Sequence, residues 1–131
     1  MNNKQVIVVR KDLNMRKGKM VAQGAHASMA AVLKNGMIIP GENGPEGFCI
    51  PLDQAMKEWL TGAFKKICVS VNSEAELLEV HQKALDAGLH CALIRDSGLT
   101  EFGGVPTYTT CAIGPNAAEV IDPITGGLPL L

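Results

Sequence analysis

Three polar side chains follow one another at helical spacing near the start of the chain. Lys19, Gln23 and His26 stand at i, i+4 and i+7 within residues 18–33, an alanine-rich segment without proline that predicts a helix. An ammonium and an imidazole on one helical face can hold a phosphate, transfer a proton or stabilise a developing negative charge. The stripe is therefore a candidate wall of a site.

The alternative is that this stripe is only the solvated side of an amphipathic helix, which is the commoner origin of such a pattern. Two features favour a site. The stripe contains no Asp or Glu, and Gly24 lies in mid-helix, where glycine costs about 1 kcal/mol relative to alanine unless close packing requires it.

The elements that position this stripe follow a strand and helix pattern. Short apolar runs predict strands near 5–10, 66–71, 91–95 and 107–113, and helices are expected at 18–33, 54–60, 74–87 and 117–121. Ser73-Glu74-Ala75-Glu76 is a capping box and gives the clearest helix start. Residues 96–106 are barely long enough for a parallel crossover, so the last strand should be antiparallel. We expect one α/β domain over residues 1–131, with a mixed sheet and helices on both faces.

Asp96 is expected just beyond the end of the third strand, as the stripe follows the first. Ligands in open α/β sheets gather beyond the carboxyl ends of the strands. If the first and third strands are neighbours, Lys19, His26 and Asp96 should meet at one crevice. The plainer alternative is that Asp96 is a turn residue that caps Gly98.

Residues 35–47 are rich in glycine and proline and are interpreted as a loop. The four cysteines, Cys49, Cys68, Cys91 and Cys111, form no CxxC pair, which favours free thiols in a reducing compartment. No apolar run approaches the roughly 20 residues of a membrane span, and no signal sequence is recognisable at the start. We therefore expect a cytoplasmic protein that does not bind membranes.

The charge of the chain is unevenly distributed. The formal net charge is −1, yet residues 1–34 carry a balance of +6, to which Lys11 and Lys17 contribute, and the remainder carries −7. An asymmetry of this kind is a hint, of low specificity, that one end of the protein meets a phosphate-rich partner.

Several sharper motifs are absent from the sequence. The phosphate-binding P-loop needs a glycine where Leu13 stands and a Ser or Thr where Met20 stands. There is no G-x-S-x-G elbow of a serine esterase. The three histidines and the dispersed cysteines show no metal-ligand spacing, so no metal and no cofactor are expected.

Segments along the whole chain, in the right order, resemble the peptidyl-tRNA hydrolases of the second type, which are typical of archaea and eukaryotes. The matching segments are Val8–Leu13, Met15, Gly18-Lys19, Ala22-Gln23, Ala25-His26-Ala27, Ser73-Glu74, Glu76-Leu77-Leu78, Ala87-Gly88-Leu89, Leu93–Glu101, Ala112-Ile113-Gly114-Pro115, Ile121-Asp122 and Thr125-Gly126.

The resemblance implies hydrolysis of the ester that joins a peptide, or a blocked amino acid, to the terminal ribose of tRNA. It also implies a four-stranded sheet between helices in three α/β/α layers, no metal, and commonly a homodimer. The family's functional positions match Lys19, Gln23, His26, Asp96 and Thr100, and counting back from Gly114-Pro115 places a further family threonine at Thr109. The stretch 40–47 is longer than expected for the family, and the chain ends in an apolar tail.

The chemistry agrees with this resemblance. An aminoacyl ester is already activated, so the protein needs only to orient water and stabilise an oxyanion. Lys19, His26 and Asp96 are the expected catalytic residues; Gln23, Thr100, Thr109, Lys11 and Lys17 are expected to bind substrate. Asp96 either accepts the proton or holds His26 or Lys19. The competing hypotheses are a non-catalytic module that binds tRNA or another phosphate-bearing ligand, and an interaction protein that uses the fold as a surface.

Overall fold

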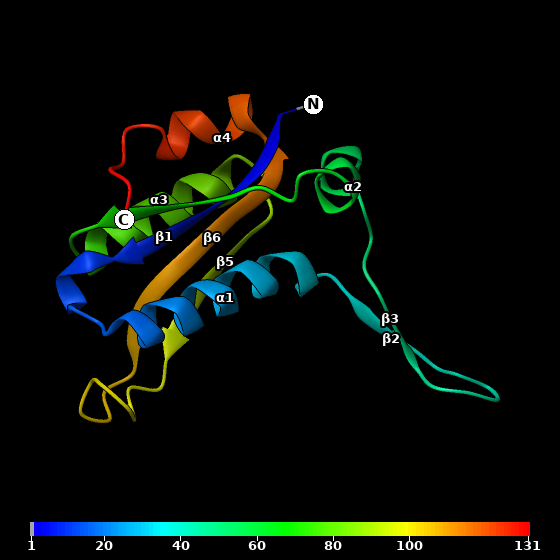
Figure 1. Cartoon of the computed structure of the whole chain (residues 1–131), viewed down its shortest axis with the longest axis horizontal. Helices are drawn as coiled ribbons and strands as arrows, with labels where there is room; N and C mark the ends of the chain where they lie inside the picture. The colour runs from blue at the N-terminus through cyan, green and yellow to red at the C-terminus, as the bar shows by residue number, and fades with distance from the viewer. Residues whose placement is uncertain (1) are drawn as a thin grey trace.

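The computed structural model describes residues 2–131 and contains two sheets flanked by four α-helices (Figure 1). The elements, in chain order, are β1 (Asn3–Arg10), a short 3₁₀ turn (Lys11–Leu13), α1 (Lys17–Leu33), β2 (Met37–Ile39), β3 (Gly47–Cys49), α2 (Gln54–Thr61), β4 (Lys66–Val71), α3 (Glu74–Asp86), β5 (Cys91–Asp96), β6 (Thr107–Ala117) and α4 (Ala118–Thr125).

The main sheet has the strand order β4-β1-β6-β5. β1 pairs with β4 in parallel, whereas β6 pairs antiparallel with both β1 and β5. The mixed sheet with an antiparallel last strand is therefore confirmed. The condition that the first and third strands be neighbours is wrong, because β6 is inserted between β1 and β5. Sequence periodicity carries no information about strand order, which long-range pairing decides.

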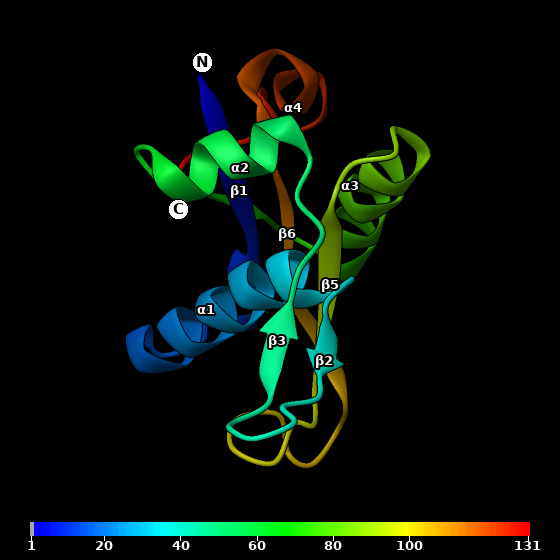
Figure 2. The same cartoon turned by 90° about the vertical axis from the view of Figure 1, so that its right-hand side faces the viewer.

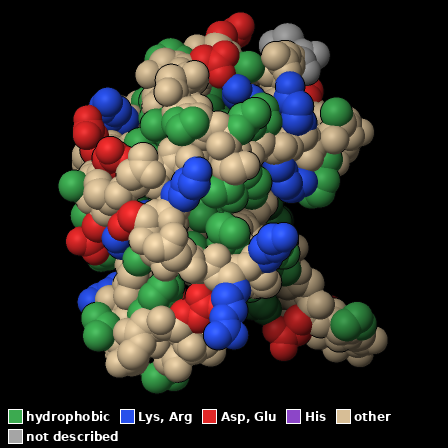
Figure 3. All heavy atoms as spheres, turned by 60° about the vertical axis from the view of Figure 1, so that its left-hand side comes forward, with side chains coloured by type: hydrophobic (Ala, Val, Ile, Leu, Met, Phe, Trp, Pro, Cys, Tyr) green, Lys and Arg blue, Asp and Glu red, His purple; other side chains and the backbone are tan. Residues whose placement is uncertain are grey.

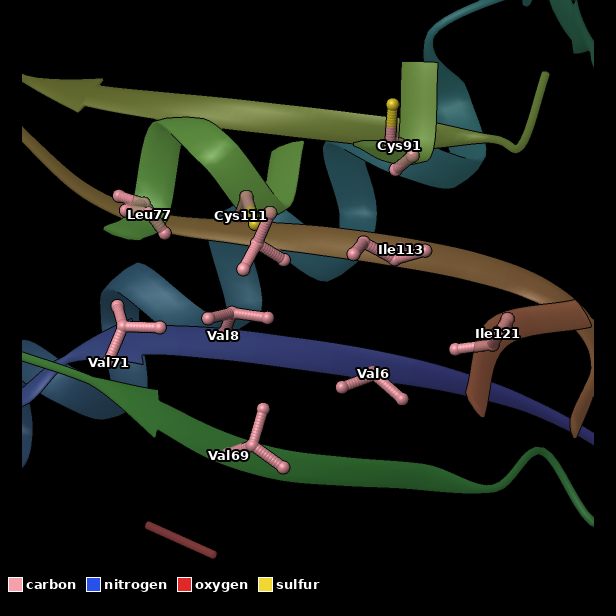
Figure 4. Close-up of a cluster of buried hydrophobic side chains, with 11 residues drawn as sticks. Val6, Val8, Val69, Val71, Leu77, Cys91, Cys111, Ile113 and Ile121 are labelled. Atoms are coloured by element: carbon pink, nitrogen blue, oxygen red, sulfur yellow. The ribbon is translucent and has the colours of Figure 1, made fainter. Parts of the chain in front are cut away.

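Helices cover both faces of the sheet (Figure 2). On one face, α3 and α4 pack on the largest core cluster, to which alternate residues of β1, such as Val6 and Val8, contribute (Figure 4). The intervening residues Ile7 and Val9 point to the opposite face, where α1 and α2 lie. Both faces of β1 are thus buried, which explains its unbroken apolar run.

Side-chain caps fix the starts of two helices. Asp53 accepts a hydrogen bond of 2.8 Å from the Met56 N–H at the start of α2. At α3 the predicted cap by Ser73 is confirmed, because Ser73 Oγ accepts from the Glu76 N–H at 3.1 Å. The Glu76 carboxylate accepts at 2.6 Å from the N–H of Asn72, one residue before the N-cap, and not from the N-cap N–H that a capping box would use.

The stretch interpreted as a loop is in part a β-hairpin. β2 and β3 pair antiparallel, with Ile38 opposite Phe48, and only residues 40–46 remain irregular. We call residues 37–49 the arm, because this hairpin projects away from the rest of the molecule (Figures 1 and 2). The glycines and prolines at its tip correctly predict an irregular segment. The strands were not predicted, because three residues are too few to show a periodic pattern.

Candidate active site

β1 and α1 are joined by a tight connection that sets the position of Lys19. The chain leaves β1 at Arg10, passes through the 3₁₀ turn, and reverses at Asn14, whose φ of 50° lies in the left-handed region that asparagine tolerates. Met15 is buried against Ile7 and Val9 and fixes the approach to α1. Lys19 consequently lies in the first turn of α1, next to the end of β5.

Lys19 is the centre of a polar network between α1 and the loop that follows β5. Its ammonium lies 3.0 Å from Asp96 Oδ1 and donates a hydrogen bond of 2.7 Å to Thr100 Oγ1. Both side chains of the ion pair are only 14% exposed. In such a setting an ion pair is screened less than at an open surface, so the lysine charge is held in one place.

Gln23, one turn further along α1, links this network to the sheet. Its side-chain Nε2 donates to Asp96 Oδ1 at 3.2 Å, and its Oε1 accepts from the Thr109 hydroxyl. Thr110 donates its hydroxyl to the Gln23 backbone carbonyl at 3.2 Å. The amide of Gln23 is buried, and this set of partners assigns the positions of its oxygen and nitrogen.

A β-bulge explains why two consecutive threonines reach the same helix. Ile94 pairs with Thr110 and Arg95 pairs with Tyr108, so Thr109 is an extra residue in β6. In a regular strand successive side chains point to opposite faces, whereas a bulge re-aims one of them. Thr109, selected by the resemblance, therefore joins Gln23; the role of Thr110 was missed.

Asp96 accepts hydrogen bonds at both of its oxygens. Oδ1 accepts from Lys19 and Gln23, and Oδ2 accepts from the Gly98 N–H at 2.8 Å. Burial raises the pKa of Asp96, but the bond from Gly98, the bond and charge of Lys19 and the bond from Gln23 outweigh it, so the pKa lies below 3.8. Asp96 is thus both the capping residue of its turn and the partner of Lys19.

The loop after β5 is held close to α1 by contacts that the sequence alone did not indicate. Gly98 has a φ of 81°, and an added Cβ would lie 2.0 Å from the Val105 carbonyl oxygen, so the loop closes tightly there. The ring of Phe102 lies 5.7 Å from the Lys19 ammonium. Glu101 accepts a hydrogen bond of 3.4 Å from the Arg16 N–H at the N-cap of α1.

His26 is not part of this network. It lies on α1 three residues beyond Gln23, and its side chain is exposed. Within residues 2–131 it makes no hydrogen bond or ion pair. The structure brings Lys19 and Asp96 into contact, whereas His26 lies seven residues, or about 10 Å, further along the helix. That His26 lines the same crevice stays a prediction. Its catalytic role stays a prediction.

Not all the cations among residues 1–34 are available to a ligand, because some are ion-paired within the chain. Lys4 pairs with Asp122 at 2.6 Å, and Arg10 pairs with Asp12 at 2.7 Å, so part of the charge is neutralised internally. Lys11 and Lys17 are exposed, and Arg16 at the entrance of α1 is 91% exposed although its Nε lies 3.9 Å from Glu101 Oε1. These three cations, which we call the basic patch, lie next to the Lys19 network in the chain.

Two further searches bear on the chemistry of the described residues. Within residues 2–131 no group of three or more His, Cys, Asp or Glu side chains could hold a metal ion. In the same part of the chain, every helix is too short or too polar to cross a membrane.

Comparison with known proteins finds a matching family model, curated relatives and a solved structure with a similar fold. A family model described as peptidyl-tRNA hydrolase PTH2 matches residues 3–131. Proteins named peptidyl-tRNA hydrolase are 45% identical in Methanocaldococcus jannaschii and 43% identical in Methanopyrus kandleri; each match covers 98% of this chain, and 99% and 97% of the relative. A solved structure of a protein of unknown function from Agrobacterium tumefaciens shares the fold, with a TM-score of 0.58 and 13% identity over 100% of this chain and 98% of that one.

The fold is of the α/β class, and the matching family model and relatives place the chain among the hydrolases. The chain belongs to the peptidyl-tRNA hydrolase PTH2 family. It is therefore an enzyme of that family, and the hypothesis of a non-catalytic module is not favoured.

Proposed function

We propose that the Lys19 network is where this enzyme cleaves the ester between a peptide, or a blocked amino acid, and the terminal ribose of tRNA. The observation that carries the proposal is the largely buried ion pair, in which the Lys19 ammonium is fixed by Asp96 and Thr100. A positive charge that is fixed before the substrate arrives costs no reorganisation during the reaction.

In this reaction a water oxygen attacks the ester carbonyl carbon, and a negative charge develops on the carbonyl oxygen. Lys19 stabilises this charge. Collapse of the tetrahedral intermediate breaks the bond to the ribose oxygen, which takes up a proton, and releases the peptide as a carboxylic acid. The atoms balance without any further reactant.

The hydrogen bonds of Asp96 and Thr100 suggest different roles for the two residues. Asp96 already accepts three hydrogen bonds and has a lowered pKa, so we assign it to holding Lys19 rather than to accepting the proton from water. Thr100 accepts from Lys19, is itself exposed, and keeps its own hydroxyl proton available for water or substrate. Thr109 and Gln23 position this pair.

The substrate is bound mainly through phosphates. The basic patch of Lys11, Arg16 and Lys17 lies at the entrance of α1 and supports the approach of the tRNA backbone to Lys19. His26, one helical turn beyond Gln23, is a candidate for contact with a part of the substrate that the network does not reach.

The proposed working form is a cytoplasmic homodimer. Cytoplasmic location is supported by four free cysteines, two of them exposed, since exposed thiols persist in reducing compartments. A homodimer is common in the family that the chain resembles, and apolar hollows along α1 support one here.

Release of peptide from labelled peptidyl-tRNA by the purified protein tests the function, and two variants separate the roles. Asp96→Asn should lower kcat by about a hundredfold or more with little change in tRNA affinity, because the shape survives and the charge that holds Lys19 is lost. Lys11→Glu should leave kcat unchanged and weaken tRNA binding, with a lower dependence on salt. Wild-type protein that binds peptidyl-tRNA without releasing peptide would instead support a binding module.

A further inference from the structure

The flank of α1 that faces β1 and β4 carries an open apolar groove, separate from the polar network. Two adjoining hollows of about 440 and 390 Å³ share Ile7 and Ala25. The first also contains Val21 and Cys68, and the second contains Met29 and Phe64. Neither contains a side chain of the Lys19 network. In the space-filling view, apolar side chains show in a hollow with Lys and Arg side chains around it (Figure 3).

The arm is also apolar and lacks a partner. Ile38 is 59% exposed and Phe48 50% exposed on one face of the hairpin, and Met37 and Ile39 are exposed on the other. The arm contributes no residue to the core clusters of the described chain. An isolated two-stranded hairpin is marginally stable in water, so the arm gains stability from any surface that covers it.

We propose that the arm of one copy fills the groove of a second copy in a reciprocal exchange. The dimensions agree. Half of the arm's 13 residues span about 20 Å at the rise of a strand. The groove follows α1 from Lys17 to Leu33, about 24 Å at the rise of a helix.

Charge complementarity also favours this occupant. The tip of the arm carries Glu42 and Glu46, and no Lys or Arg occurs from residue 35 to residue 56. The groove has Lys17 in its first hollow and Lys66 in its second, so the acidic tip meets a lysine in either direction of entry. The same acidic tip would repel the phosphates of tRNA, which argues against RNA as the partner of the arm.

The base of the arm directs it away from its own groove. The Gly36 N–H donates to the Leu33 carbonyl at 2.9 Å, directly after α1. An added Cβ at Gly36 would lie 2.3 Å from the ring of Phe48, so the turn is closely packed. To enter its own groove, the arm would have to reverse at this turn. The arm can reach the groove of a second copy without a reversal at this turn.

This inference rests on the proposed homodimer and assigns it an interface. Sedimentation velocity of the full chain over a range of concentrations should show a dimer. Replacing residues 38–48 by Asn-Gly removes the arm and keeps a two-residue hairpin turn. Ala25→Glu places a charge on the floor of the groove, at an exposed helix position that tolerates it. Each variant should raise the dimer dissociation constant at least about tenfold, and Ala22→Glu, on the same helix outside the groove, should not.

Mixing the two variants gives the sharpest readout. The armless protein keeps its groove and the Ala25→Glu protein keeps its arm, so a mixed pair regains one of the two contacts. A mixed dimer that forms more tightly than either variant alone supports the exchange. The exchange would be overturned by an armless or Ala25→Glu protein that dimerises as tightly as the wild type, by a mixture without any gain, or by a monomeric wild type.

Peptide release by the armless protein keeps this test separate from the proposed function. The arm contains none of the residues assigned to catalysis or tRNA binding. If the armless protein hydrolyses the substrate and its dimer is unchanged, only the arm exchange is refuted. If no form of the protein hydrolyses the substrate, the proposed chemistry is refuted.

Discussion

The two flanks of α1 differ in almost every physical respect. The first turns of the flank toward β5 and β6 are polar, because Lys19 and Gln23 find partners on Asp96, Thr100 and Thr109. Further along this flank, Ala27 and Ala31 pack in a small apolar cluster with residues of β5 and β6. The flank toward β1 and β4 is apolar and open, with Val21 72% exposed and Met29 58% exposed. One helix thus separates a closed hydrogen-bonded network from a surface that lacks a partner.

This difference indicates two kinds of recognition. Polar groups that are paired within the chain are held in position before any ligand arrives, which suits chemistry on a small reacting centre. Exposed apolar side chains that adjoin one another gain free energy only when a larger surface covers them. The proposed substrate site and the proposed interface with a second copy therefore use different side chains of the same helix, Lys17 excepted.

Among the changes to the polar flank of α1, removal of the Lys19 charge should cause the largest loss of activity. Lys19→Met keeps much of the side-chain volume and removes the cation that we assign to the developing oxyanion. We expect kcat to fall about 10²- to 10³-fold, which is typical for the loss of one preorganised group that stabilises such a charge.

Lys17→Met is the matched control for this change. Lys17 is exposed two residues away on the same helix, so its loss should weaken tRNA binding and leave kcat near that of the wild type. Equal losses of kcat in the two variants, measured in single-turnover peptide release, would contradict a specific role of Lys19.

His26 tests how far the site extends beyond the network. Its side chain is exposed and is not oriented by any hydrogen bond of the described chain, so His26→Ala should leave the melting temperature unchanged. We expect kcat/KM to fall about tenfold, less than the hundredfold or more of a group that transfers a proton. A loss as large as that of Lys19→Met would show that substrate binding brings His26 into the site.

Thr109 tests whether Gln23 acts as a positioning residue. Thr109→Val removes the hydroxyl that donates to Gln23 and leaves a buried amide oxygen without a partner, at a cost of about 1–3 kcal/mol in unfolding free energy. We expect kcat to fall several-fold with KM nearly unchanged, because Gln23 then orients Asp96 less well. Thr107→Val, at the start of the same strand, is the control and should change neither quantity appreciably.

Much of the frame was predictable from the sequence. The apolar runs located the four strands of the main sheet, and helical spacing placed Lys19 and Gln23 on one face. The capping box at Ser73 marked the start of α3. These patterns are local, because each depends on residues within a few positions of one another. Local patterns predict the structure correctly where the packing of the core favours the same conformation.

Apart from the hairpin of the arm, whose strands are too short for a periodic signal, the failures concern long-range geometry. The insertion of β6 between β1 and β5 depends on pairing between distant segments. The bulge at Thr109 depends on a shift of a single residue in register, which alternation cannot show. His26 shares a face with Lys19 but lies about 10 Å further along the helix, where its side chain is exposed. The resemblance to the family, rather than periodicity, selected Thr109.

Acidification should have the smallest effect on the polar flank, because the Asp96 carboxylate becomes protonated only at low pH. The quantity affected is the stability of the folded protein. Burial raises the pKa of this carboxyl, but the hydrogen bonds from Gly98, Lys19 and Gln23 and the charge of Lys19 lower it below 3.8. The unfolded chain titrates near the ordinary value of about 3.9. The stabilisation by ionised Asp96 is therefore present above about pH 4 and is lost as the pH falls through the lower folded value.

The melting temperatures of wild type and Asp96→Asn, measured from pH 7 to pH 2, check this expectation. The wild type should be the more stable by a constant margin down to about pH 4, and the margin should then shrink. Glu119→Gln is the control, because Glu119 is exposed and forms no ion pair among residues 2–131, so its margin should stay near zero throughout. A margin for Asp96 that widened on acidification would mean that the protonated acid is the better partner of Lys19. The carboxylate would then no longer be the group that holds the polar flank together.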